Sequence, residues 1–137
     1  MTSTSPLDRL GLPAMPFAQL IDLDVTRVEA GLVEGEMPVR PDLCTLGGIL
    51  HGGAIMTLAD CLGAIGAFVN LDGKASGTAT IASQTHFLGP ARSGGKVIGV
   101  ATPLHRGRRT QVWQTSIATP EGRLVAVVTQ TQMTRGA

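Results

Sequence analysis

The feature that most constrains this chain is a long apolar run over residues 53–69. It is rich in Ala, Leu, Ile and Met, contains no Pro, and ends at Asn70-Leu71-Asp72-Gly73, which predicts a helix. Its only polar side chains are Thr57, Asp60 and the thiol of Cys61. A helix that is apolar nearly all round is buried nearly all round, so we expect the rest of the chain to wrap it. The run is too short and too interrupted to span a bilayer.

Strand patterns lie on both sides of this helix. Alternation of apolar and polar residues begins at Gln19, with Ile21, Leu23 and Val25 on one side, and a second alternating run covers 32–39. Residues 41–53 are rich in Gly and are expected to form a loop. Four more strands are predicted after the helix, over residues 78–88, 97–104, 110–118 and 124–133. The order predicts a single α+β domain, residues 1–137, with an antiparallel sheet and a loose lead-in over 1–16.

Composition excludes several classes of function. The net charge of +1 and the 3% aromatic content argue against a nucleic-acid-binding protein. Charged residues are only 15%, against about 25% in typical proteins, so we expect part of the surface to be covered by copies of the chain. Cys44 and Cys61 lack metal or disulfide spacing and are predicted to be buried free thiols. The first residues show no signal peptide, which predicts a cytoplasmic protein.

The predicted helix has two different faces. At 100° per residue, one face is a continuous aliphatic stripe, and Asp60 lies about 180° from it. The stripe consists of Ile55, Leu58, Leu62, Ile65 and Val69. The helical neighbours of Asp60 are Met56, Thr57, Gly63 and Ala64. We expect the stripe to pack on the chain's own sheet and the small-residue face to receive the same helix of a second subunit.

Asp60 stands out because burying a lone carboxylate is costly unless other groups compensate it. No Lys or Arg occurs between Pro41 and Gly73, so no local ion pair is available. Two interpretations stay open from the residues alone. Asp60 is either held by hydrogen bonds from distant residues, or it faces a cleft as a base or nucleophile.

The start of the helix reads Gly47-Gly48-Ile49-Leu50-His51-Gly52-Gly53. Glycines let another molecule approach the backbone closely. The first N–H groups of a helix lack intrahelical partners and carry the positive end of its dipole, which suits a polarised carbonyl or oxyanion. The alternative is an ordinary tight loop in which His51 is a structural cap.

The segment Gly48-Ile-Leu-His-Gly-Gly-Ala-Ile-Met-Thr-Leu-Ala-Asp60 resembles the signature of hotdog-fold thioesterases of the phenylacetate-pathway (PaaI) type. The resemblance extends from about Pro16 to Thr134. It implies a sheet wrapped around one long helix, dimers with helices back to back, and dimers that associate into homotetramers. It also implies hydrolysis of an acyl-CoA thioester to a free acid and CoA, in sites shared between subunits.

The resemblance assigns roles to residues of this chain. Gly52 would donate its backbone N–H to the thioester carbonyl, and His51 would shape that turn. Asp60 of the partner would act as general base or nucleophile, and Thr80 supplies a nearby hydroxyl. Many family members have Asn or Gln six residues before the histidine, and Thr45 stands there in this chain. That departure concerns rate and substrate choice more than fold.

Other residues are expected to bind the substrate. Gly53, Met56 and Pro90 would line its site, while Arg92, Arg106, Arg108 and Arg109 would contact the phosphates of coenzyme A. A solvated hairpin tip is the alternative for these arginines. The predicted reaction needs no cofactor, and the sequence shows no metal-ligand spacing. Two rival functions stay open: a non-catalytic acyl-CoA-binding module, and a hotdog-fold hydratase or dehydratase.

Overall fold

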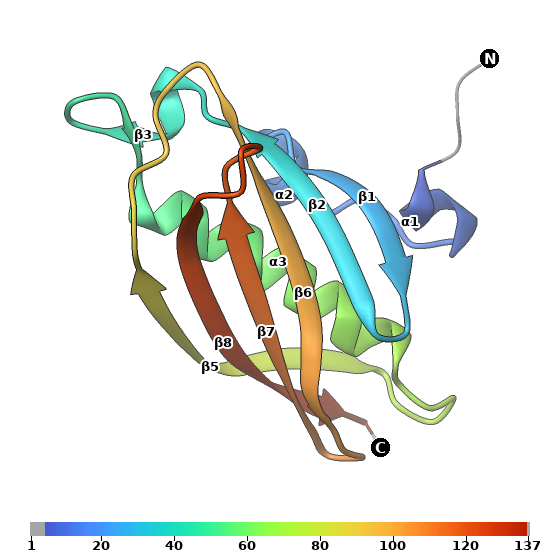
Figure 1. Ribbon diagram of the computed structural model, residues 1–137. Helices are drawn as coiled ribbons and strands as arrows, with labels where there is room; N and C mark the ends of the chain where they lie inside the picture. Colours follow the sequence, from blue (N-terminus) through green and yellow to red (C-terminus); the bar gives the residue numbers. More distant parts are fainter. Residues whose placement is uncertain (1–4, 137) are drawn as a thin grey trace.

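The structure is a computed structural model that describes residues 5–136. Six antiparallel strands form one sheet in the order β1-β2-β6-β7-β8-β5, and this sheet curves around the long helix α3, Gly52–Val69 (Figure 1). The strands are β1 Asp24–Glu29, β2 Leu32–Pro38, β5 Gly77–Phe87, β6 Lys96–Arg106, β7 Thr110–Ala118 and β8 Leu124–Arg135. The predicted α+β class, with a sheet around one central helix, is confirmed.

Short elements lie on both sides of β1 and β2 in the chain. They are the helices α1 Pro6–Arg9 and α2 Pro16–Leu20, the 3₁₀ turn η1 Pro41–Leu43, and the small hairpin of β3 Cys44–Thr45 and β4 Ile49–Leu50. The prediction of a strand starting near Ile21 was wrong. Pro16 starts a helical turn, Asp22 takes a positive φ of 55°, and the strand begins only at Asp24. Ile21 and Val25 are both buried, so their spacing reflects burial rather than a strand.

The helix α3 sits close to the sheet because both contribute glycines at the contact. A Cβ on Gly99 of β6 would lie 2.7 Å from the Leu62 side chain of the helix. A Cβ on Gly66 of α3 would lie 2.6 Å from the Trp113 ring of β7. These distances are too short for real side chains, so glycine is what lets the two layers meet here. The predicted aliphatic stripe includes Leu58 and Leu62, which are fully buried in this layer.

One face of α3 stays open. Gly53, Met56, Asp60 and Phe68 are exposed and Ala64 is half-buried, which forms a strip along the helix. Gly63, which the sequence placed beside Asp60 on the small-residue face, instead points at the sheet, where Gln130 fills the space beside it. The sequence run was predicted to be too short and too interrupted to span a bilayer, which was wrong as to length and composition, because α3 is long and apolar enough to cross a membrane. Half of the helix is buried inside the fold, which accounts for its composition.

Strand β5 forms one edge of the sheet and pairs only with β8. Most of its residues are exposed, and its register shifts between Thr80 and Ala82. Large apolar side chains on or next to this strand are open to solvent: Ile81 is 56%, Phe87 54% and Leu88 57% exposed. A long, apolar, unpaired edge is the kind of surface that proteins cover with another chain.

Candidate active site

The N-terminus of α3 presents one free backbone donor. His51 is the N-cap, and its Nδ1 accepts a hydrogen bond from the Gly53 N–H at 2.8 Å. The hydrogen bonds among residues 5–136 give the Gly52 N–H no acceptor. The loop before the helix is fixed, since His51 N–H donates to Leu43 O and Leu50 N–H donates to Ala91 O. Gly52 therefore offers a positioned N–H at the positive end of the helix dipole.

Asp60 is exposed on the open face of α3, and distant residues also hold it by hydrogen bonds. The Thr80 hydroxyl of β5 donates to Asp60 Oδ1 at 2.8 Å. The Gln130 side-chain amide of β8 lies 3.3 Å from the same oxygen. The first interpretation left open by the sequence, a carboxylate held by hydrogen bonds from distant residues, is confirmed, and the role of Asp60 as base or nucleophile stays a prediction. The carboxylate is oriented through Oδ1, and the described contacts leave Oδ2 free to act on a ligand.

Gln132 of β8 extends this hydrogen-bond network beyond Thr80. Its amide Nε2 donates to Thr80 Oγ1 at 2.5 Å, so the Thr80 hydroxyl proton is directed toward Asp60. Gln130 and Gln132 are each only 1% exposed. Neither was predicted from the sequence, although a signal was present: both occupy inward positions of β8, in step with Val128, where a polar side chain needs a partner.

The donor and the carboxylate are far apart within one chain. Gly52 and Asp60 are separated by eight residues of helix, which is about 12 Å along the axis. One thioester carbonyl and its attacking water cannot reach both groups at hydrogen-bond distance. Phe87, at the end of β5, covers Gly52 closely: a Cβ on Gly52 would lie 3.1 Å from its ring. Within the described chain, the Gly52 N–H and the Asp60 carboxylate therefore do not converge on one point.

The structure also places three other residues that were predicted to belong to the site. Met56 is on the open face of α3, midway between Gly52 and Asp60 in the sequence. Thr45 is exposed in β3, opposite Ile49, in the hairpin that leads to the helix start. The carbonyl oxygen of Pro90 accepts a hydrogen bond from Arg123 at 2.7 Å, so Pro90 anchors its loop.

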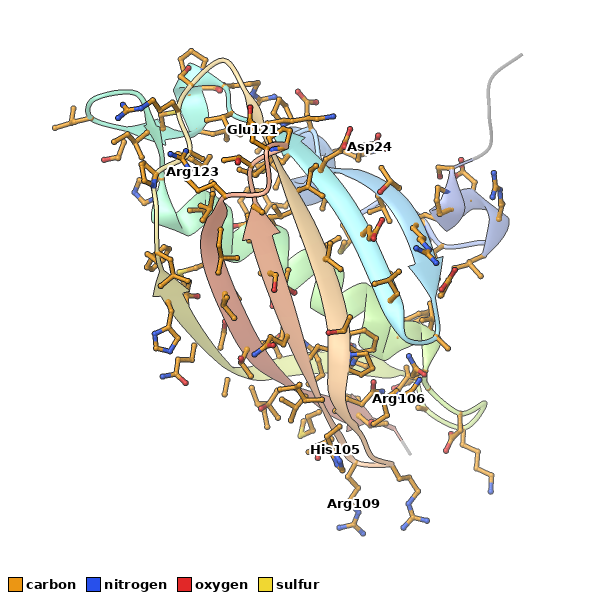
Figure 2. All side chains as sticks on the ribbon, in the orientation of Figure 1. Asp24, His105, Arg106, Arg109, Glu121 and Arg123 are labelled. Carbon is orange, nitrogen blue, oxygen red and sulfur yellow. The ribbon has the colours of Figure 1, made fainter. Side chains whose placement is uncertain are left out.

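The four predicted arginines lie at opposite ends of the sheet, with three at the β6–β7 turn and Arg92 at the other end. Arg123, which was not predicted from the sequence, lines a hollow together with Arg92, and Figure 2 shows it at the end of the sheet opposite to Arg109. Arg108 and Arg109 line a hollow at the β6–β7 turn together with Lys74. Arg106 is engaged structurally, because its Nη1 donates to Ala30 O at 3.2 Å.

The other basic group lies beside the start of α3. Arg92 pairs with Ile49 of the small hairpin through an isolated bridge. A hollow of about 330 Å³ is lined by Arg92, Lys96 and Arg123. Lys96 is paired with Glu36 at 3.2 Å, and Glu121 also lines the hollow. Arg92 and Arg123 supply the positive charge of the hollow that the ion pairs among residues 5–136 do not use.

The two cysteines are free thiols, as predicted, and Cys61 is buried, but the predicted burial of Cys44 was wrong because its side chain is only half-buried. Burial, and to a lesser degree the charge of neighbouring Asp60, raises the pKa of the Cys61 thiol to about 11. A thiol of that pKa is protonated at neutral pH and is a poor nucleophile. Residues 5–136 contain no group of three His, Cys, Asp or Glu side chains placed to hold a metal ion.

Comparison with known proteins identifies the family of this chain. The thioesterase superfamily matches residues 47–126 of the chain. The proofreading thioesterase EntH of Klebsiella pneumoniae is 40% identical over 98 residues, which are 72% of this chain and 70% of that protein. The 1,4-dihydroxy-2-naphthoyl-CoA hydrolase of Escherichia coli is 34% identical over 104 residues, covering 76% and 75% of the two chains.

Solved structures give the same result. Thioesterase HI1161 of Haemophilus influenzae superposes with a TM-score of 0.86 at 27% identity, covering 99% of this chain and 92% of the other. The PaaI protein of E. coli shares the fold, with a TM-score of 0.81 at 21% identity over 90% and 86% of the chains. This chain therefore belongs to the thioesterase superfamily, has the hotdog fold of the PaaI type, and is a thioester hydrolase.

Proposed function

We propose that the protein hydrolyses acyl-CoA thioesters in a site shared by two subunits. The observation that carries this proposal is the separation of about 12 Å between the free Gly52 N–H and the oriented Asp60 carboxylate on one helix. In a symmetric dimer with antiparallel α3 helices, Gly52 of one subunit would lie opposite Asp60 of the other. The symmetry axis would pass near Met56, and two equivalent sites would form.

The exposed surface supports such a dimer. The open strip of α3 and the free edge of β5 adjoin each other through the Thr80–Asp60 hydrogen bond. Both carry exposed apolar side chains, including Met56 and Ile81. Covering them would remove apolar area from water and pair an unsatisfied strand edge. We extend the proposal to a homotetramer of two such dimers.

The reaction follows from the chemistry of the two halves. Asp60 takes a proton from a water molecule, whose oxygen attacks the thioester carbonyl carbon. The Gly52 N–H stabilises the negative charge that develops on the carbonyl oxygen. The carbon–sulfur bond then breaks, the CoA thiolate leaves and takes up the proton held by Asp60, directly or through water, and the free acid remains. Direct attack by Asp60, through an anhydride that water then hydrolyses, uses the same residues and is the second route.

Coenzyme A is the proposed thiol because of the basic groups and one relative. The E. coli relative is named as a CoA-thioester hydrolase. Arg92 lies next to the loop that leads to Gly52, where the nucleotide phosphates could be bound. With antiparallel helices, the partner's β6–β7 turn, with Arg108 and Arg109, would approach the same end of the site. We place the reaction in the cytoplasm.

The test is thiol release from a panel of acyl-CoAs, followed with a thiol-reactive chromophore, using wild type, Asp60→Asn and Asp60→Ala. We expect wild-type turnover of at least one acyl-CoA and a loss of roughly two orders of magnitude or more in both variants. Turnover unchanged in both variants would remove Asp60 from the mechanism. Binding of acyl-CoA without any turnover would instead support the alternative in which the protein is a non-catalytic acyl-CoA-binding module.

A further inference from the structure

An apolar pocket of about 310 Å³ opens beside the C-terminal half of α3. The helix contributes Ala64, Ile65 and Phe68 to its wall. The segment that precedes the sheet contributes four more apolar residues, Leu7, Leu12, Pro13 and Met15. Leu7 and Met15 also pack against the hydrophobic core, so this segment is anchored rather than loose. The volume of the pocket is at the lower end of the range for small-molecule sites.

The pocket begins next to the catalytic half-site that contains Asp60. Ala64 follows Asp60 by one helical turn, about 6 Å along the axis, on the same open face. Thr78 lines the pocket from β5 and precedes Thr80, the hydrogen-bond donor to Asp60, by two residues on that strand. A thioester carbonyl held near Asp60 would therefore have the pocket on one side to receive its acyl substituent.

The chemistry of the wall defines what fits. The helix and the N-terminal segment offer only hydrocarbon and thioether side chains. The side chains with polar groups are Ser76, just before β5, Thr78, at the start of β5, and Arg135, at the end of β8. Ser76 is already used, since its hydroxyl lies 3.2 Å from Arg135 O. A hydroxyl or carboxylate pressed against the apolar side would lose its water without gaining a partner.

We propose that this pocket binds the acyl group, that it selects an unsubstituted apolar acyl group of medium length, and that the segment Leu7–Met15 sets this length. The proposal rests on the proposed function and deepens it. Each methylene buried in the pocket raises kcat/KM about fourfold until the pocket is full. A hydroxyl on the buried part lowers it roughly tenfold or more.

The experiment measures kcat/KM for acetyl-, butanoyl-, hexanoyl-, octanoyl- and decanoyl-CoA, and for phenylacetyl- and 4-hydroxyphenylacetyl-CoA. Two variants change the pocket in opposite directions. Ala64→Leu fills the pocket near Asp60 and moves the preferred chain length down, whereas Leu12→Ala enlarges it and moves the preference up. Leu10→Ala is the matched control, because Leu10 is 50% exposed on the same segment and does not line the pocket.

The outcomes separate the two levels of the proposal. A length preference that shifts in opposite directions in Ala64→Leu and Leu12→Ala, with no shift in Leu10→Ala, supports the pocket. A profile that neither pocket variant changes, or a preference for the hydroxylated ring, overturns the pocket while the proposed hydrolysis stands. A wild-type protein that cleaves no acyl-CoA overturns the proposed function, and this inference falls with it.

Discussion

Replacing Gly52 by proline tests the oxyanion role of one backbone N–H. Proline is favoured at the first position of a helix, where the N–H has no intrahelical partner. The residue before it is already suitable, because His51 has φ −64° and ψ 138°, the extended region that a following proline requires. Gly52→Pro thus removes the donor while the helix start can stay as it is.

Gly52→Ala is the matched control. Both variants add a Cβ about where the Phe87 ring lies 3.1 Å away, and that exposed ring can shift by a few tenths of an ångström. Only the proline lacks the N–H. Loss of one oxyanion donor lowers kcat by roughly 10²–10³-fold, or about 3–4 kcal/mol of transition-state stabilisation. We expect that difference between the two variants in initial rates of thiol release at saturating acyl-CoA, with equal helical circular dichroism. Equal rates would refute the oxyanion role.

Mixing variants tests whether the site is shared. Gly52→Pro and Asp60→Asn chains, each inactive alone, are co-expressed with different tags in equal amounts. In a symmetric dimer, half of the dimers are mixed and each has one intact site, so about one quarter of wild-type activity returns. If Gly52 and Asp60 of the same chain served one site, every site would be defective. No recovered activity, with mixed dimers isolated by both tags, would therefore refute the composite site.

Two further predictions concern groups around Asp60. Thr80→Val removes the hydrogen bond to Asp60 but keeps the shape of the side chain, so kcat should fall roughly ten- to hundredfold with little change in KM. Thr80→Ser keeps the hydroxyl and should retain most of the wild-type kcat, whereas a wild-type kcat in Thr80→Val would show that the bond is dispensable. Burial raises the pKa of the Cys61 thiol from 9.0 to about 11. The contribution of this thiol to stability is therefore complete below pH 9, and it is lost as the pH rises to 11 and the thiol ionises in the folded protein as well as in the unfolded chain. Urea denaturation should show about 2 kcal/mol more alkaline loss in wild type than in Cys61→Ala, and parallel curves would contradict the assignment.

The central helix and its two faces were predictable because they follow from composition and the 3.6-residue period. Leu58 and Leu62 lie in the buried stripe and Asp60 on the open side, as expected. The helix start was predictable for a different reason: free N–H groups are a property of every helix N-terminus, and His51 and Gly52 mark this one. Local rules therefore predict both the free N–H group at the helix start and the carboxylate on the open face.

What the sequence did not predict depends on contacts between distant segments. Gln130 and Gln132 approach Asp60 only because β8 lies beside β5 in the sheet, and the strand order is not encoded in either strand alone. Gly63 illustrates the same limit. Counting at 100° per residue placed it near Asp60, but whether a small residue faces a partner or its own sheet depends on which side chain stands opposite, here Gln130.

The spacing of the two halves along α3 has a physical reason. A carboxylate in the first helical turn would accept the free N–H groups itself and would neutralise the positive end of the dipole. His51 caps only the Gly53 N–H, and Asp60, two turns on, is oriented by Thr80 instead, so the Gly52 N–H stays available. Keeping donor and base apart in one chain thus preserves both groups, and a second copy of the helix, running the opposite way, is what would bring them to one carbonyl.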